Sequence, residues 1–157
     1  MNSGGKLKEV IIEILKRTEK GLTRTQLVKL CFLIDRLAVE RLGRPITGLC
    51  YSMYYYGPYS PDIIDAAREM EEEERLVKYT GISLTTGEPY YIYRLADNEK
   101  QMQSISGLEK NEIIVIDEVV KEHGSLSLKK LLDFVYDLPE VKEARLGEKI
   151  NWSEISS

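Results

Sequence analysis

The segment from residue 24 to about residue 42, RTQLVKLCFLIDRLAVERL, is apolar around most of its circumference when it is read as a helix. Apolar side chains recur at helical spacing along one face and also fill much of the rest: Leu27, Val28, Leu30, Cys31, Phe32, Leu33, Ile34, Leu37, Ala38 and Val39. A helix that is apolar on most sides is usually buried on most sides. We therefore expect this helix to be the centre around which the remaining elements pack.

The elements expected around this helix follow from periodicity and from turn residues. Apolar spacing predicts helices, whereas short aromatic and β-branched runs bounded by Gly and Pro predict strands. The sequence predicts helices at 6–19, 61–75, 109–123 and 127–136, an extended segment at 49–56, and a hairpin of strands at 76–84 and 90–95. Residues 96–107 are polar and resemble a linker, and residues 140–152 have room for one further helical turn.

This order predicts an α+β fold that is mostly helical. Its first part runs helix, helix, strand, helix and hairpin, which is the order of a winged helix, and two C-terminal helices follow. The alternative is a general α+β domain that shares this order by coincidence.

The length of 157 residues suits one domain with one core. We expect residues 1–5 to be flexible, residues 6–145 to form the domain, and residues 146–157 to be a loose tail. The sequence has no apolar run of the roughly 18 residues that a membrane span requires, and its first residues lack the apolar centre of a signal peptide. A cytoplasmic protein is therefore expected.

Small residues and prolines mark the corners of the chain between residues 43 and 61. Gly43 is expected to end the central helix, and Pro45 prevents its continuation. Gly57 and Pro58 are expected to break the extended segment. Ser60 is the predicted N-cap of the next helix, with Pro61 at its first position.

The net charge of −4 conceals an uneven distribution. Residues 1–50 hold ten Lys/Arg and five Asp/Glu, whereas residues 51–157 hold twelve Lys/Arg and twenty-one Asp/Glu. In a winged-helix DNA reader the third helix enters the major groove. Here that helix is rich in acids and ends in four glutamates, so phosphate would repel it. The basic residues of the first two helices leave open DNA contact in another orientation, contact with an acidic protein, or simple solvation.

No motif of a hydrolase, a nucleotide-binding loop or a metalloprotease occurs in the sequence. The two cysteines are separated and the chain has one histidine, so a structural zinc site lacks ligands. We therefore expect a protein that is not an enzyme and that uses no cofactor and no metal.

Tyrosines are concentrated beside the Gly57-Pro58 step, in the stretch YYYGPYS. Alternation along an extended segment would direct one set of tyrosines toward the central helix and leave the other set free. Tyrosine is enriched in protein interfaces because it combines a large apolar area with a polar tip. The alternative is that both sets are covered, one by the helices and the other by the hairpin.

Three stretches, LVKLCFLID, GRPITG and YYYGPYSPD, occur in this order, and the hairpin and the late helices follow them. Together they resemble the Panacea, or SocA-like, antitoxin domain family over about residues 6–145. The YGPYS motif is also similar to one found in a group of small bacterial and archaeal proteins related to that domain. This resemblance implies an antitoxin that neutralises a toxin by direct contact and is not a catalyst.

Taken together, the resemblance and the residues predict an antitoxin-like module that binds a protein partner. The sequence leaves its oligomeric state open, with a dimer as one option. The predicted binding face joins the tyrosines to the acidic third helix and comprises Tyr54, Tyr55, Tyr56, Tyr59, Asp62, Asp65, Glu69, Glu72 and Glu73. Acidic side chains there would complement a basic toxin. The alternative function is a winged-helix transcriptional regulator that binds DNA through its first two helices.

Overall fold

A computed structural model describes residues 4–101 and 107–152. Within these ranges the elements follow in the order α1 (Gly4–Lys16), β1 (Leu22–Thr23), α2 (Arg24–Leu42), β2 (Ser52–Tyr54), β3 (Gly57–Tyr59), α3 (Pro61–Glu72), β4 (Leu76–Ile82), β5 (Pro89–Leu95), α4 (Asp97–Gln101), α5 (Lys110–His123), α6 (Leu128–Tyr136) and α7 (Pro139–Lys142). The fold is α+β with mostly helices and small antiparallel sheets, as predicted. No helix of the described ranges is both long enough and apolar enough to cross a membrane.

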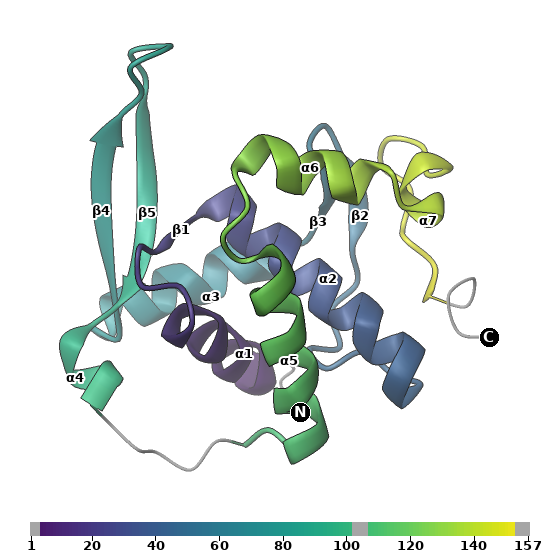
Figure 1. The fold of residues 1–157 in the computed structure, drawn as a ribbon, viewed down its shortest axis with the longest axis horizontal. Helices are drawn as coiled ribbons and strands as arrows, with labels where there is room; N and C mark the ends of the chain where they lie inside the picture. Colours follow the sequence, from purple (N-terminus) through teal and green to yellow (C-terminus); the bar gives the residue numbers. More distant parts are fainter. Residues whose placement is uncertain (1–3, 102–106, 153–157) are drawn as a thin grey trace.

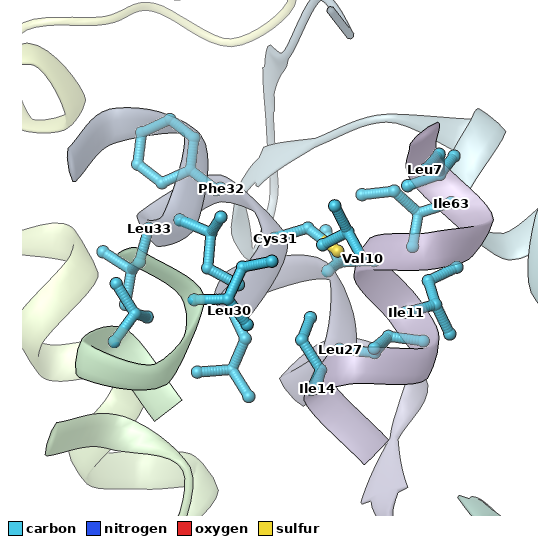
Figure 2. Close-up of a cluster of buried hydrophobic side chains, with 14 of the residues drawn as sticks. Leu7, Val10, Ile11, Ile14, Leu27, Leu30, Cys31, Phe32, Leu33 and Ile63 are labelled. Atoms are coloured by element: carbon cyan, nitrogen blue, oxygen red, sulfur yellow. The ribbon is translucent and has the colours of Figure 1, made fainter. Parts of the chain in front are cut away.

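Helix α2 is the centre of the fold (Figure 1), and α1, α3, α5 and α6 all contact it. Every residue from Leu27 to Asp35 is buried, so this part of the helix is covered on all sides. Figure 2 shows apolar side chains of α1, including Val10 and Ile14, facing those of α2, including Leu27 and Cys31. The prediction of a buried central helix is confirmed.

Local sequence sets both ends of α2. The Thr23 hydroxyl oxygen accepts a hydrogen bond from the backbone N–H of Gln26, and the side-chain oxygen of Gln26 accepts one from the backbone N–H of Thr23. Together they form a capping box. At the other end Gly43 adopts a left-handed φ of 78° and donates its N–H to the Val39 carbonyl. Glycine reaches this conformation without strain, so the predicted end of the helix is confirmed.

The predicted hairpin of β4 and β5 is present and projects from the helical body (Figure 1). Its second strand also pairs with the two-residue strand β1, which the sequence did not predict. The resulting sheet has the order β1-β5-β4. The winged-helix comparison remains a prediction.

Four expectations about local structure are corrected. The extended segment 49–56 is a strand only over Ser52–Tyr54, and Gly57 does not break it but begins the partner strand β3. Residues 4 and 5, expected to be flexible, belong to α1, whereas residues 1–3 lie outside the described ranges. The polar stretch 96–107 contains the short helix α4, and residues 102–106 are likewise outside the description.

The expected loose tail is the fourth correction, because residues 146–152 pack against β2. Met53 exchanges backbone hydrogen bonds with Gly147 and Glu148, and the Ile150 amide donates to the Tyr51 carbonyl. The Trp152 ring stacks on Phe32 with centroids 5.4 Å apart. Apolar burial and strand-like pairing therefore hold this part of the chain, and residues 153–157 lie outside the described ranges.

Candidate functional site

A buried carboxylate on α2 fixes the chain that leads to the tyrosines. Asp35 is fully buried and accepts hydrogen bonds from the Ile46 and Thr47 amides, at 2.8 and 3.0 Å, and from the Thr47 hydroxyl. The Tyr51 hydroxyl donates to the same carboxylate at 2.8 Å. Burial raises the pKa of Asp35, although these hydrogen bonds act in the opposite direction. Asp35 thus ties the 43–49 turn and the start of the tyrosine stretch to the central helix.

The tyrosine stretch forms a tight hairpin. In it Ser52 pairs with Tyr59, Met53 with Pro58 and Tyr54 with Gly57, so Tyr55 and Tyr56 form the turn. Gly57 has a φ of 97°, which favours glycine. The Tyr136 hydroxyl on α6 donates to the Tyr55 carbonyl at 3.2 Å. Ser60 and Pro61 then begin α3 as predicted, although the Ser60 side chain makes no capping hydrogen bond.

We call Tyr54, Tyr55, Tyr56 and Tyr59 the tyrosine corner. Tyr55 is 81% exposed, Tyr56 67% and Tyr54 48%. The Tyr54 and Tyr59 rings lie 5.0 Å apart between centroids. The predicted alternation fails here because Tyr55 and Tyr56 lie in a turn, where side chains no longer alternate between two faces. The alternative in which every tyrosine is covered is wrong for these three residues.

A pocket of about 250 Å³ lies beneath the tyrosine corner. Its walls come from α2, from the β2–β3 hairpin and from α3, and its lining residues are Arg24, Thr25, Val28, Lys29, Tyr54, Tyr55, Tyr56, Tyr59 and Ile64. The lining contains no acidic side chain. The pocket is therefore an aromatic and aliphatic cavity with two basic residues.

Lys29 is the residue of this pocket that sequence reasoning placed wrongly. Lys29 is one of the ten basic residues within residues 1–50, all of which were expected to contact DNA, an acidic protein or solvent, but only 2% of it is exposed. Its Nζ donates to the Pro58 carbonyl at 2.9 Å, and burial lowers its pKa to about 8. Its position between Val28 and Leu30, in a helix apolar on most sides, was the signal that could have identified it.

The acidic half of the predicted face is separate from this pocket. The five acids are all exposed, four of them on α3 and the last at its C-cap: Asp62, Asp65, Glu69, Glu72 and Glu73. Glu69 and Glu73, however, form salt bridges with Lys8 of α1, at 2.9 and 3.5 Å. Successive residues of an α-helix are rotated by about 100° about its axis. Glu69 and Glu73 therefore point to a different side of α3 from Ile64, which lines the pocket. The pocket lining thus contains the four tyrosines and none of the five acids, and two of the acids, Glu69 and Glu73, are paired with α1.

The uneven charge of the sequence is largely balanced inside the fold. Seven of the ten basic residues within residues 1–50 form salt bridges with acidic side chains: Lys6, Lys8, Lys16, Arg17, Arg36, Arg41 and Arg44. Many of their partners are on α3 and α5, in the acidic part of the sequence. Within the described ranges, Lys20, Arg24 and Lys29 form no salt bridge, and Lys29 is not at the surface.

Glu112 is the centre of one such network, which the sequence analysis did not anticipate. Its fully buried carboxylate contacts Lys6 and Arg44, each at 2.9 Å, and accepts the Glu109 amide at 2.8 Å. Burial alone would raise the pKa of Glu112, but these donors hold it below its ordinary value. The ion pairs join α1 and the 43–49 turn to α5.

Comparison with known proteins gives one match. The family model described as "Antitoxin SocA-like, Panacea domain" matches residues 27–140, which include most of α2, the tyrosine corner, α3, the β4–β5 hairpin, α5 and α6. No curated protein and no solved structure matches the chain. Because the match spans most of the sequence and contains the motifs that form this corner, the chain belongs to the SocA-like, Panacea antitoxin domain family.

Proposed function

We propose that this chain is an antitoxin-like module that is not an enzyme and that neutralises a partner toxin by direct contact through the tyrosine corner. The observation that carries the proposal is the exposure of Tyr54, at the end of β2, and of Tyr55 and Tyr56, in the turn of a well-anchored hairpin. Exposed aromatic side chains on rigid backbone give a large contact area at a small cost in conformational entropy. Family membership supports the choice of a toxin as partner.

The acidic side of α3 is the second part of the proposed face. Asp62, Asp65 and Glu72 are exposed on the helix that follows the tyrosine corner. A toxin that acts on nucleic acid or ribosomes is usually basic, and exposed carboxylates would speed its association. The proposed place of action is the cytoplasm.

Binding of DNA through the first two helices has less support. Affinity for duplex DNA depends on Lys and Arg side chains that neutralise phosphates. Most of the basic side chains on α1 and α2 already neutralise carboxylates of the same chain, and α3 remains acidic. A phosphate would therefore have to displace existing ion pairs.

A growth assay tests the proposal. The chain would be co-expressed with the toxic product of the neighbouring reading frame, as wild type and as a Tyr55→Ala/Tyr56→Ala variant. We expect the wild type to restore growth and the variant to fail, since truncating two exposed contact residues costs binding without costing stability. The matched control is Tyr79→Ala on β4, which removes a tyrosine that is 50% exposed at a distant site. Equal rescue by the double variant and the control would contradict the proposal.

A further inference from the structure

The pocket beneath the tyrosine corner has a cationic floor that lacks a counter-ion. Lys29 is only 2% exposed, and within the part of the chain that the structure describes its Nζ atom makes one hydrogen bond, to the Pro58 carbonyl. An ammonium group has three donors, so two remain for another acceptor. Within residues 4–101 and 107–152, no carboxylate forms an ion pair with it.

Arg24 adds a second cation at the same pocket. Its Nε atom is buried and has no hydrogen-bond partner within the described part of the chain. Its guanidinium lies over the Tyr91 ring, 5.3 Å from the centroid, which holds the side chain beside the pocket. Buried polar groups in native proteins are generally satisfied, so two incompletely satisfied cations lining one cavity indicate a missing anion.

We propose that this pocket receives the carboxylate of an aspartate or glutamate side chain from the protein partner, with Lys29 and Arg24 as its donors. This inference rests on the proposed function, and it specifies which chemistry of the partner the corner recognises. The aromatic and aliphatic walls, including Tyr54, Tyr59 and Ile64, would cover the carbon atoms of that side chain.

Size and charge favour a carboxylate over a phosphate. The cavity of about 250 Å³ is of the order of a single large side chain. A carboxylate has two oxygens, which can accept from the Lys29 ammonium and from the Arg24 guanidinium. A phosphate carries nearly twice the charge into the same apolar enclosure, where desolvation would oppose it.

The pKa of Lys29 gives a direct readout of this contact. Burial without a counter-ion lowers the pKa to about 8, and an anion within hydrogen-bond distance would raise it again. The full chain, labelled with ¹³C-lysine, would be titrated by NMR with the capped peptide acetyl-Leu-Glu-Leu-amide. We expect saturation to raise the Lys29 pKa by about one unit or more. Acetyl-Leu-Gln-Leu-amide is the matched neutral probe and should leave the pKa unchanged.

Two variants accompany the titration. Arg24→Gln should weaken binding of the glutamate peptide about tenfold, which corresponds to the loss of one charge-assisted hydrogen bond. Lys130→Met removes an exposed lysine on α6 and should have no effect. The inference is overturned if neither peptide changes the Lys29 pKa, or if both change it equally. It is also overturned if phenyl phosphate raises the pKa more than the glutamate peptide does, because the pocket would then recognise phosphate.

The two proposals fail separately. If Lys29 does not respond but the tyrosine variant loses rescue of growth, only the carboxylate inference is wrong. If Lys29 responds while the tyrosine variant neutralises the toxin normally, the pocket binds an acidic side chain but the proposed neutralising face is wrong.

Discussion

Replacing Lys29 by methionine should stabilise the protein at neutral pH. Lys29 is 2% exposed, and burial lowers its pKa from 10.5 to about 8. Each pKa unit corresponds to about 1.4 kcal/mol, so keeping this ammonium charged in the folded state costs about 3 kcal/mol. Methionine has a similar shape and no charge, but it leaves the Pro58 carbonyl without its donor, at a cost of about 1–2 kcal/mol. The expected net gain is about 1–2 kcal/mol near pH 7.

The pH dependence distinguishes this explanation from a simple packing effect. The folded pKa lies below the unfolded one, so the unfolded chain binds more protons between about pH 8 and pH 10.5. Wild-type stability should therefore gain about 2–3 kcal/mol relative to the variant between about pH 7 and pH 10. Below about pH 7 the difference between the two proteins should be constant, because Lys29 is then almost fully protonated in both the folded and the unfolded state.

Urea unfolding followed by circular dichroism measures both the gain in stability near pH 7 and its change with pH. Comparing variant with wild type at each pH cancels the contributions of other titrating groups, including the tyrosines. Lys130→Met is the control, because this exposed lysine should contribute little at either pH. A difference between Lys29→Met and wild type that is the same at about pH 7 and pH 10 would refute the reasoning, since it would mean that burial does not perturb Lys29.

Three further substitutions test the supports of the site, each by urea unfolding. Asp35→Ala should destabilise the fold by about 3–5 kcal/mol, because four buried donors lose their acceptor. The control Asp65→Ala, on the exposed side of α3, should cost under about 0.5 kcal/mol, and similar costs for the two variants would contradict the account. Glu112→Gln should cost about 1–3 kcal/mol near pH 7. The pKa of Glu112 is lowered in the folded state, so its contribution to stability is present above the ordinary value of 4.5 and is lost as the pH falls through the folded pKa. A stability difference between wild type and Glu112→Gln that persists in strong acid would argue against ion pairing. Gly57→Ala should lower the free energy of unfolding more than Gly87→Ala does. Both glycines have positive φ, but only the methyl group at position 57 would lie 3.3 Å from the Tyr136 ring. Equal losses would show that this contact is relieved by a shift of the ring.

The sequence predicted the elements whose signal is local. Periodicity identified the central helix and the two late helices, and the Ser60-Pro61 pair identified the start of α3. The hairpin of β4 and β5 could be predicted because its strands are separated by a short turn. Each of these features depends on residues close together in the chain.

Features that depend on distant pairing could not be predicted in the same way. Strand β1 has two residues and gains its identity only by pairing with Ile92 and Tyr93 of β5. The packing of residues 146–152 depends on the position of β2, which the tail's own composition does not reveal. Short elements carry too few residues for a periodic signal.

The candidate site was predicted in part for the same reason. The tyrosines were identified from their local density and from the tight corner of the chain. Glu69 and Glu73 are paired with Lys8 of α1 through salt bridges that join residues far apart in the sequence. The cationic floor was missed because a lysine in a sequence is ordinarily a surface residue, and only the covering of α2 on every side buries Lys29.

Calorimetric titration of the purified chain with its toxin tests the central claim most directly. The account predicts a direct complex whose affinity falls at least about tenfold in the Tyr55→Ala/Tyr56→Ala variant and is unchanged in Tyr79→Ala. A complex of undiminished affinity with the double variant would contradict it, as would neutralisation of the toxin without any detectable complex.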